Sequence, residues 1–198
     1  MPTKLILIRH GETDLNLKKR YCGFLDIAIN ARGRKQAGKL YQRLRDEKID
    51  KVYSSDRKRA VQTAKIIFKK RKIEILPGLR EMHFGIFEGL TYKQIMKKHP
   101  MVYKKWLKDP YRITIPEGEG LPGLKKRVIA SLTKVIRLNK NRTIAVVAHG
   151  GVISAFLNHI LKSRDFWKHI PKSTGLSVIE FRKNKPEIKL FNDIRHLN

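Results

Sequence analysis

The hydrophobic pattern changes period several times along the chain. Residues 4–8, "KLILI", contain a short run of four apolar residues that predicts a buried strand. From about Ala31 apolar residues recur with helical spacing, which predicts a helix with Asn30 as its N-cap. The same criteria predict further strands at 50–55, 73–76 and 143–148, helices at 57–70, 123–138 and 152–161, and a terminal hairpin at 176–181 and 187–191 joined by "RKNKP".

Strands alternate with helices over most of this length. The alternation predicts a single α/β domain over residues 1–198, a three-layer α/β/α sandwich with a mainly parallel central sheet. Residues 79–122 interrupt the pattern with irregular sequence and two short helices, the first capped by Thr91. We expect this segment to be an insertion that covers the functional site.

The charge balance is strongly basic. Lys and Arg number 45 against 17 Asp and Glu, a formal net charge of +28. Such a field attracts polyanions and small phosphorylated molecules alike. Most basic clusters, such as "KKRK" at 69–72, interrupt helical patterns and resemble solvated helix faces. A nucleic-acid partner stays an alternative, although neither zinc-finger spacing nor an aromatic platform supports it.

Other features of the composition bear on the cellular setting. Apolar runs stay far below the ~20 residues that span a bilayer, so no membrane partner is expected. The start, "MPTKLILIRHG", does not resemble a secretory signal. The single cysteine, Cys22, excludes an internal disulfide framework. These features predict a cytoplasmic protein, and a homodimer stays open.

Charged and imidazole side chains follow several predicted strands directly. Arg9 and His10 follow the first strand, His149 follows residues 143–148, and Arg59 and Glu81 follow two others at a short distance. Because the carboxyl ends of parallel strands meet at one edge of a sheet, we expect these side chains to gather there.

This set of residue types suits a phosphoryl group. Guanidinium groups match phosphate oxygens in bidentate geometry. A neutral imidazole is a competent nucleophile near pH 7, and a carboxylic acid can protonate a leaving oxygen. Arg9 follows four apolar residues, and burying its charge without a partner would cost several kcal/mol. A bound anion could supply that partner.

The residues also carry a resemblance to a known family. "LILIRHGET", with Asn16, resembles the signature of the histidine phosphatase superfamily, which contains cofactor-dependent phosphoglycerate mutase. Later segments resemble its other motifs in the same order and span nearly the whole chain: "VYSSDRKRAVQTA", "LREMHFGIFEG", "PEGEG" with "KKRV", and "VVAHGGVI".

The resemblance implies a role for each matching residue. His10 would be the phosphorylated nucleophile, and Glu81 would be the proton donor and later the base for water. Arg9, Arg59 and His149 would hold the phosphoryl oxygens. No metal or cofactor is implied, because arginines take the place of a cation. On the substrate side, the resemblance implies contacts from Asn16, Cys22, Gly23, His83 and Gly150.

Two departures from the family pattern concern recognition more than chemistry. Cys22 stands before Gly23 where many members have Gln, and Gly118-Glu119-Gly120 lacks the usual serine of that loop. Because the chain is short and offers little material for a lid, a phosphatase is favoured over a mutase. The resemblance implies two candidate substrates among short phosphatases of this type, α-ribazole 5′-phosphate and phosphoserine. The ending "FNDIRHL" resembles that of α-ribazole phosphatases, and broad activity on small phosphate monoesters is an equal alternative.

Two functions of other classes stay open. A non-catalytic module that binds polyanions or nucleic acid would account for the net charge of +28. A metallohydrolase would use as ligands His10, His83, His149 and Glu81. The two arginines expected beside them disfavour a bound cation.

Overall fold

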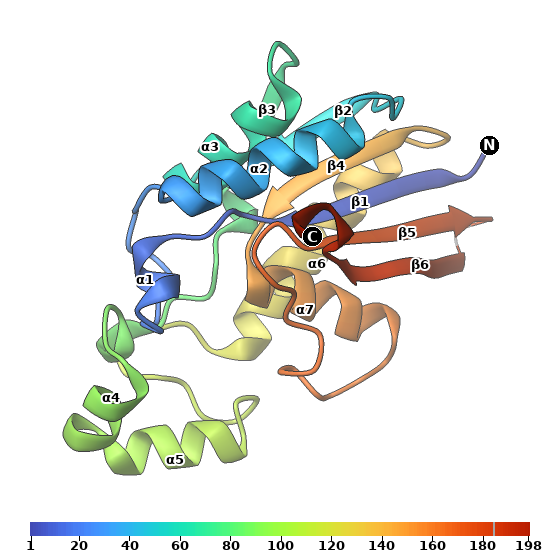
Figure 1. Cartoon of the computed structure of the whole chain (residues 1–198). Helices are drawn as coiled ribbons and strands as arrows, with labels where there is room; N and C mark the ends of the chain where they lie inside the picture. Colours follow the sequence, from blue (N-terminus) through green and yellow to red (C-terminus); the bar gives the residue numbers. More distant parts are fainter. Residues whose placement is uncertain (184) are drawn as a thin grey trace.

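The computed structural model describes residues 1–183 and 185–198; Asn184, in the expected hairpin turn, lies outside them. Six strands form one sheet in the order β3-β2-β4-β1-β5-β6. The pairs β1–β4, β4–β2 and β2–β3 are parallel, whereas β1–β5 and β5–β6 are antiparallel (Figure 1). The predicted α/β fold with a mainly parallel sheet is confirmed. The strands are β1 (Thr3–Arg9), β2 (Lys51–Ser54), β3 (Ile73–Ile75), β4 (Thr143–Ala148), β5 (Leu176–Arg182) and β6 (Lys185–Asp193).

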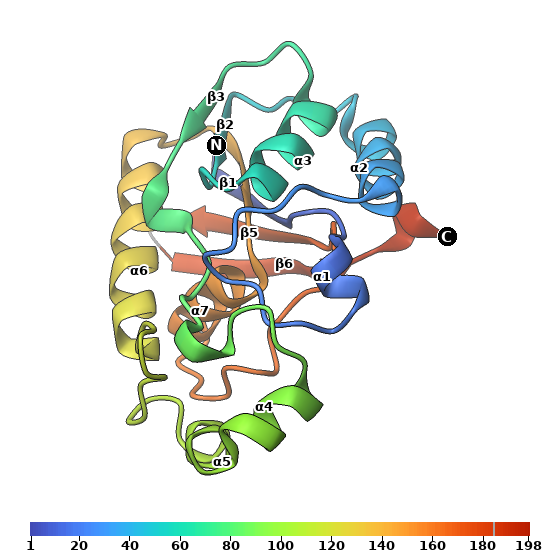
Figure 2. The ribbon, with the colours of Figure 1, turned by 90° about the vertical axis from the view of Figure 1, so that its left-hand side faces the viewer.

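Helices cover both faces of this sheet (Figures 1 and 2). On one face, α2 (Ala31–Leu44) and α3 (Lys58–Phe68) share an apolar cluster with Ile6 and Ile8 of β1. On the other, α6 (Leu121–Leu138) and α7 (Gly150–Ile160) pack with Leu5 and Leu7. Because alternate residues of β1 enter opposite cores, its middle residues 5–8 are all apolar.

The helix starts follow from local chemistry. The Asn30 side chain accepts a hydrogen bond from Gly33 N–H at 2.8 Å, so the expected cap is confirmed. Two helices begin two residues earlier than expected. Pro122 belongs to the first turn of α6, where a missing N–H costs nothing. Gly150 and Gly151, expected as a loop, form the first turn of α7.

The irregular segment lies beyond the carboxyl ends of the parallel strands (Figure 1). It carries α4 (Tyr92–Lys98) and α5 (Pro100–Lys108). Thr91 caps α4 through a reciprocal capping box, as predicted. Trp106 of α5 is fully buried and joins the segment to the α6–α7 core. Within residues 1–183 and 185–198, no helix combines the length and hydropathy that a membrane crossing requires.

Candidate active site

The ends of β1 and β4 place two histidines together. Arg9 lies beside Ala148 in the parallel register, so His10 and His149 follow neighbouring strands at the same level. The His10 backbone N–H donates to the Ala148 carbonyl at 3.0 Å. The two imidazole centroids are 5.2 Å apart, with their planes at 62°. Both rings are therefore close enough to contact one tetrahedral oxyanion.

The tautomer of His10 follows from one hydrogen bond. Its Nδ1 lies 2.8 Å from the Gly11 carbonyl oxygen, which can only accept, so Nδ1 carries the hydrogen and Nε2 keeps its lone pair. Burial lowers the pKa of His10 well below 6.5, and the charges of Arg59 and Arg9 add to the effect. Near pH 7, His10 is a neutral imidazole with Nε2 free to attack.

Two arginines reach this imidazole pair from different segments. Arg59, at the start of α3, is fully buried and donates to the carbonyl oxygens of Gly23 and Leu25 at 2.7 Å. Arg9 donates from Nη1 to the Pro171 carbonyl at 2.6 Å. These backbone acceptors fix both guanidiniums in place without neutralising their charge.

Three buried nitrogens of this cluster have no hydrogen-bond partner within the described part of the chain. They are Nε of Arg9, Nε of Arg59 and Nδ1 of His149. A buried polar group without a partner costs about 1–3 kcal/mol, and more when it is charged. A phosphoryl group bound here would supply acceptor oxygens to all three.

The orientation of His149 depends on a residue that the sequence interpretation did not single out. Its Nε2 lies 2.9 Å from Oγ of Ser55, which is fully buried at the end of β2. Burial, followed by the charge of Arg59, lowers the pKa of His149 well below 6.5. The serine pair at this strand end was visible in the sequence, but the contact with His149 depends on the sheet order.

Glu81 is held at the N-terminus of α7. Its Oε2 accepts a hydrogen bond from Gly151 N–H and its Oε1 one from Met82 N–H, both at 2.9 Å. A Cβ on Gly151 would lie 2.5 Å from Oε1 of this carboxylate. A glycine is therefore needed at position 151 for Glu81 to reach the helix terminus. Glu81 is 8% exposed.

A buttress outside the centre supports this acid. Arg127 of α6 donates to the carbonyl oxygens of Arg80 and Glu81, at 2.6 and 3.0 Å. Both carboxylate oxygens of Glu119 accept from the same guanidinium at 2.7 Å. The loop "GEG", expected near the substrate side, therefore uses its carboxylate to fix Arg127 and, through it, the Glu81 backbone.

A hollow of about 260 Å³ opens beside the centre and is lined on one side by three of the predicted substrate-side residues, Asn16, Cys22 and Gly150. Oδ1 of Asn16 accepts from Thr13 N–H at 3.2 Å in the capping box of α1 (Asp14–Leu17). Burial raises the pKa of the Cys22 thiol to about 11, so it stays protonated near pH 7.

The other two predicted substrate-side residues are not part of this lining. The imidazole of His83 stacks on Phe24, with centroids 4.4 Å apart. Gly23 is buried, and a Cβ there would lie 1.9 Å from the Met82 carbonyl oxygen. Its N–H donates to Glu88, which the sequence interpretation missed and which fixes the loop that holds Arg59.

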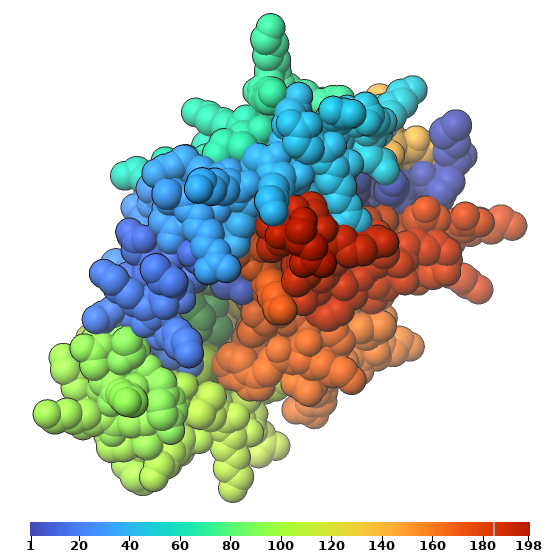
Figure 3. All heavy atoms as spheres, viewed as in Figure 1, coloured from blue at the N-terminus to red at the C-terminus, as the bar shows by residue number. Residues whose placement is uncertain are grey.

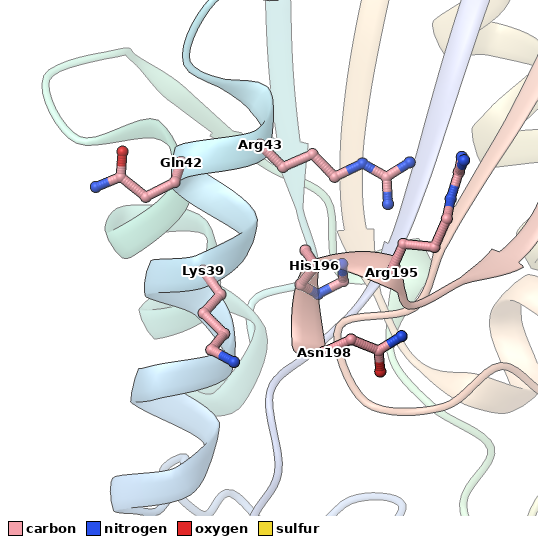
Figure 4. A pocket seen from close by; sticks show the side chains of 6 residues that line it. All are labelled: Lys39, Gln42, Arg43, Arg195, His196 and Asn198. Atoms are coloured by element: carbon pink, nitrogen blue, oxygen red, sulfur yellow. The ribbon is translucent and has the colours of Figure 1, made fainter.

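The C-terminal segment supports the end of β1, next to His10. Thr174 N–H donates to the carbonyl oxygens of Arg9 and His10 at 3.1 and 3.3 Å, and its hydroxyl lies 3.0 Å from Nε2 of His196. His196 belongs to the short 3-10 helix η3 (Arg195–Leu197), which packs against α2 (Figure 4). Asp193 pairs with Arg43 of α2 and so ties the two elements together. Between them lies an open cavity of about 590 Å³ lined by Lys39, Gln42, Arg43, Arg195, His196 and Asn198.

The structure also bears on a possible metal site. Across residues 1–183 and 185–198, no group of three His, Cys, Asp or Glu side chains is arranged to hold a metal ion.

A sequence model of the histidine phosphatase superfamily (branch 1) matches residues 5–194. The chain belongs to this superfamily. It is 37% identical to phosphoglycerate mutase-like protein 4 of Arabidopsis thaliana, over 98% of this chain and 86% of that protein. It is 32% identical to phosphoserine phosphatase 1 of Hydrogenobacter thermophilus, over 98% and 94%.

Solved structures of the superfamily share the fold. The phosphoserine phosphatase of Entamoeba histolytica, in a complex with phosphoserine, has a TM-score of 0.90 at 31% identity and covers 99% of this chain and 100% of its own. The α-ribazole phosphatase of Shigella flexneri has a TM-score of 0.89 at 28% identity, with 96% of each chain covered. Membership of a superfamily with these named phosphatases makes phosphoric monoester hydrolysis the activity class of this chain.

Proposed function

We propose that this histidine phosphatase hydrolyses small phosphate monoesters through a phosphohistidine intermediate at His10. One observation carries the proposal: Arg9, Arg59 and His149, each with a buried nitrogen that has no partner among the described residues, lie near a neutral imidazole whose Nε2 is free. Glu81 lines the same hollow as Arg9, which supports its assignment as the acid.

In the first step, Nε2 of His10 attacks the phosphorus atom. The bond between phosphorus and the ester oxygen breaks, and the leaving oxygen takes its proton from the carboxylic acid form of Glu81. Arg9, Arg59 and His149 hold the three equatorial oxygens as charge develops on them. With the Ser55 hydroxyl donating to Nε2 of His149, its Nδ1 carries the hydrogen that it gives to a phosphoryl oxygen.

In the second step, water replaces the alcohol. Glu81, now a carboxylate, takes a proton from the water as its oxygen attacks phosphorus, and the bond to Nε2 of His10 breaks. Inorganic phosphate leaves, and His10 returns to its neutral form. The guanidiniums supply the positive charge throughout, so we propose that the reaction needs no metal.

The physiological ester is a narrower question. Relatives are named for phosphoserine and for α-ribazole phosphate, and either is a candidate substrate here. A relative named as phosphoglycerate mutase-like keeps mutase activity as an alternative. The hollow beside Glu81 is open to the surface, which supports water as the final acceptor and therefore hydrolysis.

The test is turnover of a generic aryl phosphate in excess chelator. We expect wild-type protein to release phosphate and His10→Ala to lose at least about 10⁴-fold in kcat, because the nucleophile is missing. His99→Ala, in the insertion, is the matched control and keeps its activity. After rapid acid quenching of wild-type protein with labelled substrate, phosphate should be bound to His10. Undiminished turnover by His10→Ala would refute the proposal.

The alternative of a polyanion-binding module has its own test. It rests on the net charge of +28 and predicts tight binding of duplex or single-stranded nucleic acid, with affinity that falls steeply with salt. Negligible binding at ~0.15 M salt would remove it.

A further inference from the structure

The outer walls of the hollow are aromatic. Arg9, His10, Arg59, Glu81 and His149 are here called the phosphoryl centre. Beyond it, the ring of Phe84 comes from the insertion, and Phe166 and Trp167 follow α7. Trp167 packs edge-on against Trp106 of α5, at 5.1 Å between centroids, and against Phe166 at the same distance. It is 38% exposed, so one part of the indole is held and another faces the opening.

This opening is visible on the surface. Figure 3 shows a recess where the blue α1 region, the green insertion and the orange segment after α7 meet. Its lining comes from these three parts of the chain: Asn16 and Lys19 from the first, Phe84 from the second, and Trp167 and Ile170 from the third. A leaving group attached to a phosphoryl at His10 would therefore extend between aromatic and aliphatic side chains.

The charged side chains of the lining are mostly cationic. Lys19 and Arg20 belong to it together with Arg9, whereas Glu81 is the one carboxylate among the described lining residues. Both oxygens of Glu81 accept backbone N–H groups. Arg20 is partly engaged, since it donates to the Gly89 carbonyl at 2.5 Å.

Two carboxylates outside the lining, those of Glu88 and Asp165, already accept hydrogen bonds from backbone N–H groups. Glu88 accepts from the N–H groups of Gly23 and Phe24, at 3.0 and 2.8 Å. Asp165 accepts from Trp167 and Lys168, both at 3.2 Å. An ammonium group on the leaving alcohol would thus meet Lys19 without gaining a free carboxylate.

We propose that the hollow selects phosphate monoesters whose leaving alcohol carries an uncharged, flat apolar body, and that it discriminates against alcohols carrying an ammonium group. A flat ring buries apolar surface against Trp167 and Phe84, whereas an ammonium is desolvated in a cationic surrounding. The inference rests on the proposed phosphatase activity.

The test compares three primary-alcohol phosphates, so that the leaving oxygen is similar in each. They are 2-phenylethyl phosphate, propyl phosphate and phosphoethanolamine. We expect kcat/KM to be at least about tenfold higher for the phenylethyl than for the propyl ester, as burial of roughly two methylene equivalents predicts. The kcat/KM for phosphoethanolamine should fall below that for the propyl ester.

Variants assign the selectivity to its residues. Trp167→Ala should reduce the phenylethyl-to-propyl ratio at least about fivefold, and Trp167→Phe should restore most of it. Lys19→Gln should reduce the difference in kcat/KM between propyl phosphate and phosphoethanolamine. Phe191→Ala is the matched control, because Phe191 is 40% exposed and lies outside the lining; its ratios should equal those of wild type.

The outcomes separate this inference from the proposed function. If wild-type protein hydrolyses the esters but its kcat/KM for phosphoethanolamine equals that for the phenylethyl ester, the selectivity is overturned and the phosphatase stands. A ratio that Trp167→Ala leaves unchanged overturns the assignment to the aromatic wall. If no ester is hydrolysed, the proposed function fails and this inference fails with it.

Discussion

The phosphoryl centre and the hollow beside it differ in how they are built. In the centre, His149 and Arg59 are fully buried and His10 is 4% exposed. Every one of these side chains is held by a hydrogen bond, mostly to backbone carbonyl groups. In the hollow, Lys19 and Trp167 are exposed and belong to connecting segments.

This difference separates chemistry from selectivity. A substitution of one side chain in the centre would leave another buried group without its hydrogen-bond partner. Such a loss reduces the free energy of unfolding. Exposed side chains on connections change at little cost. Relatives named for phosphoserine and for α-ribazole phosphate accordingly share the fold of this chain, with TM-scores of 0.90 and 0.89. The predictions that follow test this separation.

The largest effect is expected from the acid. Glu81→Gln keeps the size of the side chain and an oxygen that can accept from one of the two backbone N–H groups, but its NH2 group cannot accept from the other and it cannot give a proton to the leaving oxygen. We expect kcat to fall by about 10²–10⁴ for an alkyl ester, and by much less for a nitrophenyl ester, whose alcohol leaves without a proton. Equal losses for both esters would show that Glu81 has another role.

The next effect concerns the buttress behind that acid. Arg127→Met removes the donor to the carbonyl oxygens of Arg80 and Glu81 and leaves Glu119 unpaired. We expect a loss of about 1–3 kcal/mol in the free energy of unfolding and about tenfold in kcat, measured by urea unfolding and steady-state kinetics. The control is Lys126→Met, a neighbouring exposed cation, and an equal loss there would contradict the assignment.

A smaller effect is expected at the C-terminal segment. His196→Ala removes the partner of the Thr174 hydroxyl, which lies behind the Arg9–His10 backbone. We expect a fall of several-fold in kcat with little change in KM, and partial recovery in His196→Gln, whose amide can replace the hydrogen bond. Exposed His159→Ala serves as the control. A change in KM alone would place His196 on the substrate side instead.

The buried imidazoles also make stability depend on pH. Burial lowers the pKa of His10 and His149 below 6.5 in the folded protein, so below that pH the unfolded chain binds more protons. The free energy of unfolding should therefore fall as pH decreases from about 6.5 to 5, with a shallower slope in His149→Asn. Hydrogen bonds from Arg195 and Arg43 lower the pKa of Asp193. Protonation of Asp193 therefore reduces the free energy of unfolding only below its ordinary pKa of 3.8. Urea midpoints at pH 7.5, 6.0 and 5.0 measure the slope.

The smallest effect is expected from cations of the insertion. Lys104 and Lys108 lie at exposed positions of α5, outside the hollow, and the test replaces each with Gln. We expect changes within about 0.5 kcal/mol in the free energy of unfolding and less than about twofold in kcat/KM. A larger loss of kcat/KM that disappears at high salt would show that these charges steer the substrate.

Much of the fold could be predicted because its elements have local causes. The uninterrupted apolar run of β1 and the Asn30 and Thr91 caps lie within a few residues of the structures that they determine. The sequence predicts the starts of α6 and α7 two residues too late. Proline and glycine are typical of loops, and here they occupy the first turns of both helices.

The sequence by itself determined which residue types stand at the strand ends, and with them the expected chemistry of His10, Arg9, Arg59, Glu81 and His149. Only the tertiary structure decided which groups complete that centre. Ser55, Arg127 and Thr174 join it through contacts across about 45 to 165 positions of sequence. Strand and helix patterns are local, whereas sheet order and helix packing set these contacts, so no short window of sequence contains them.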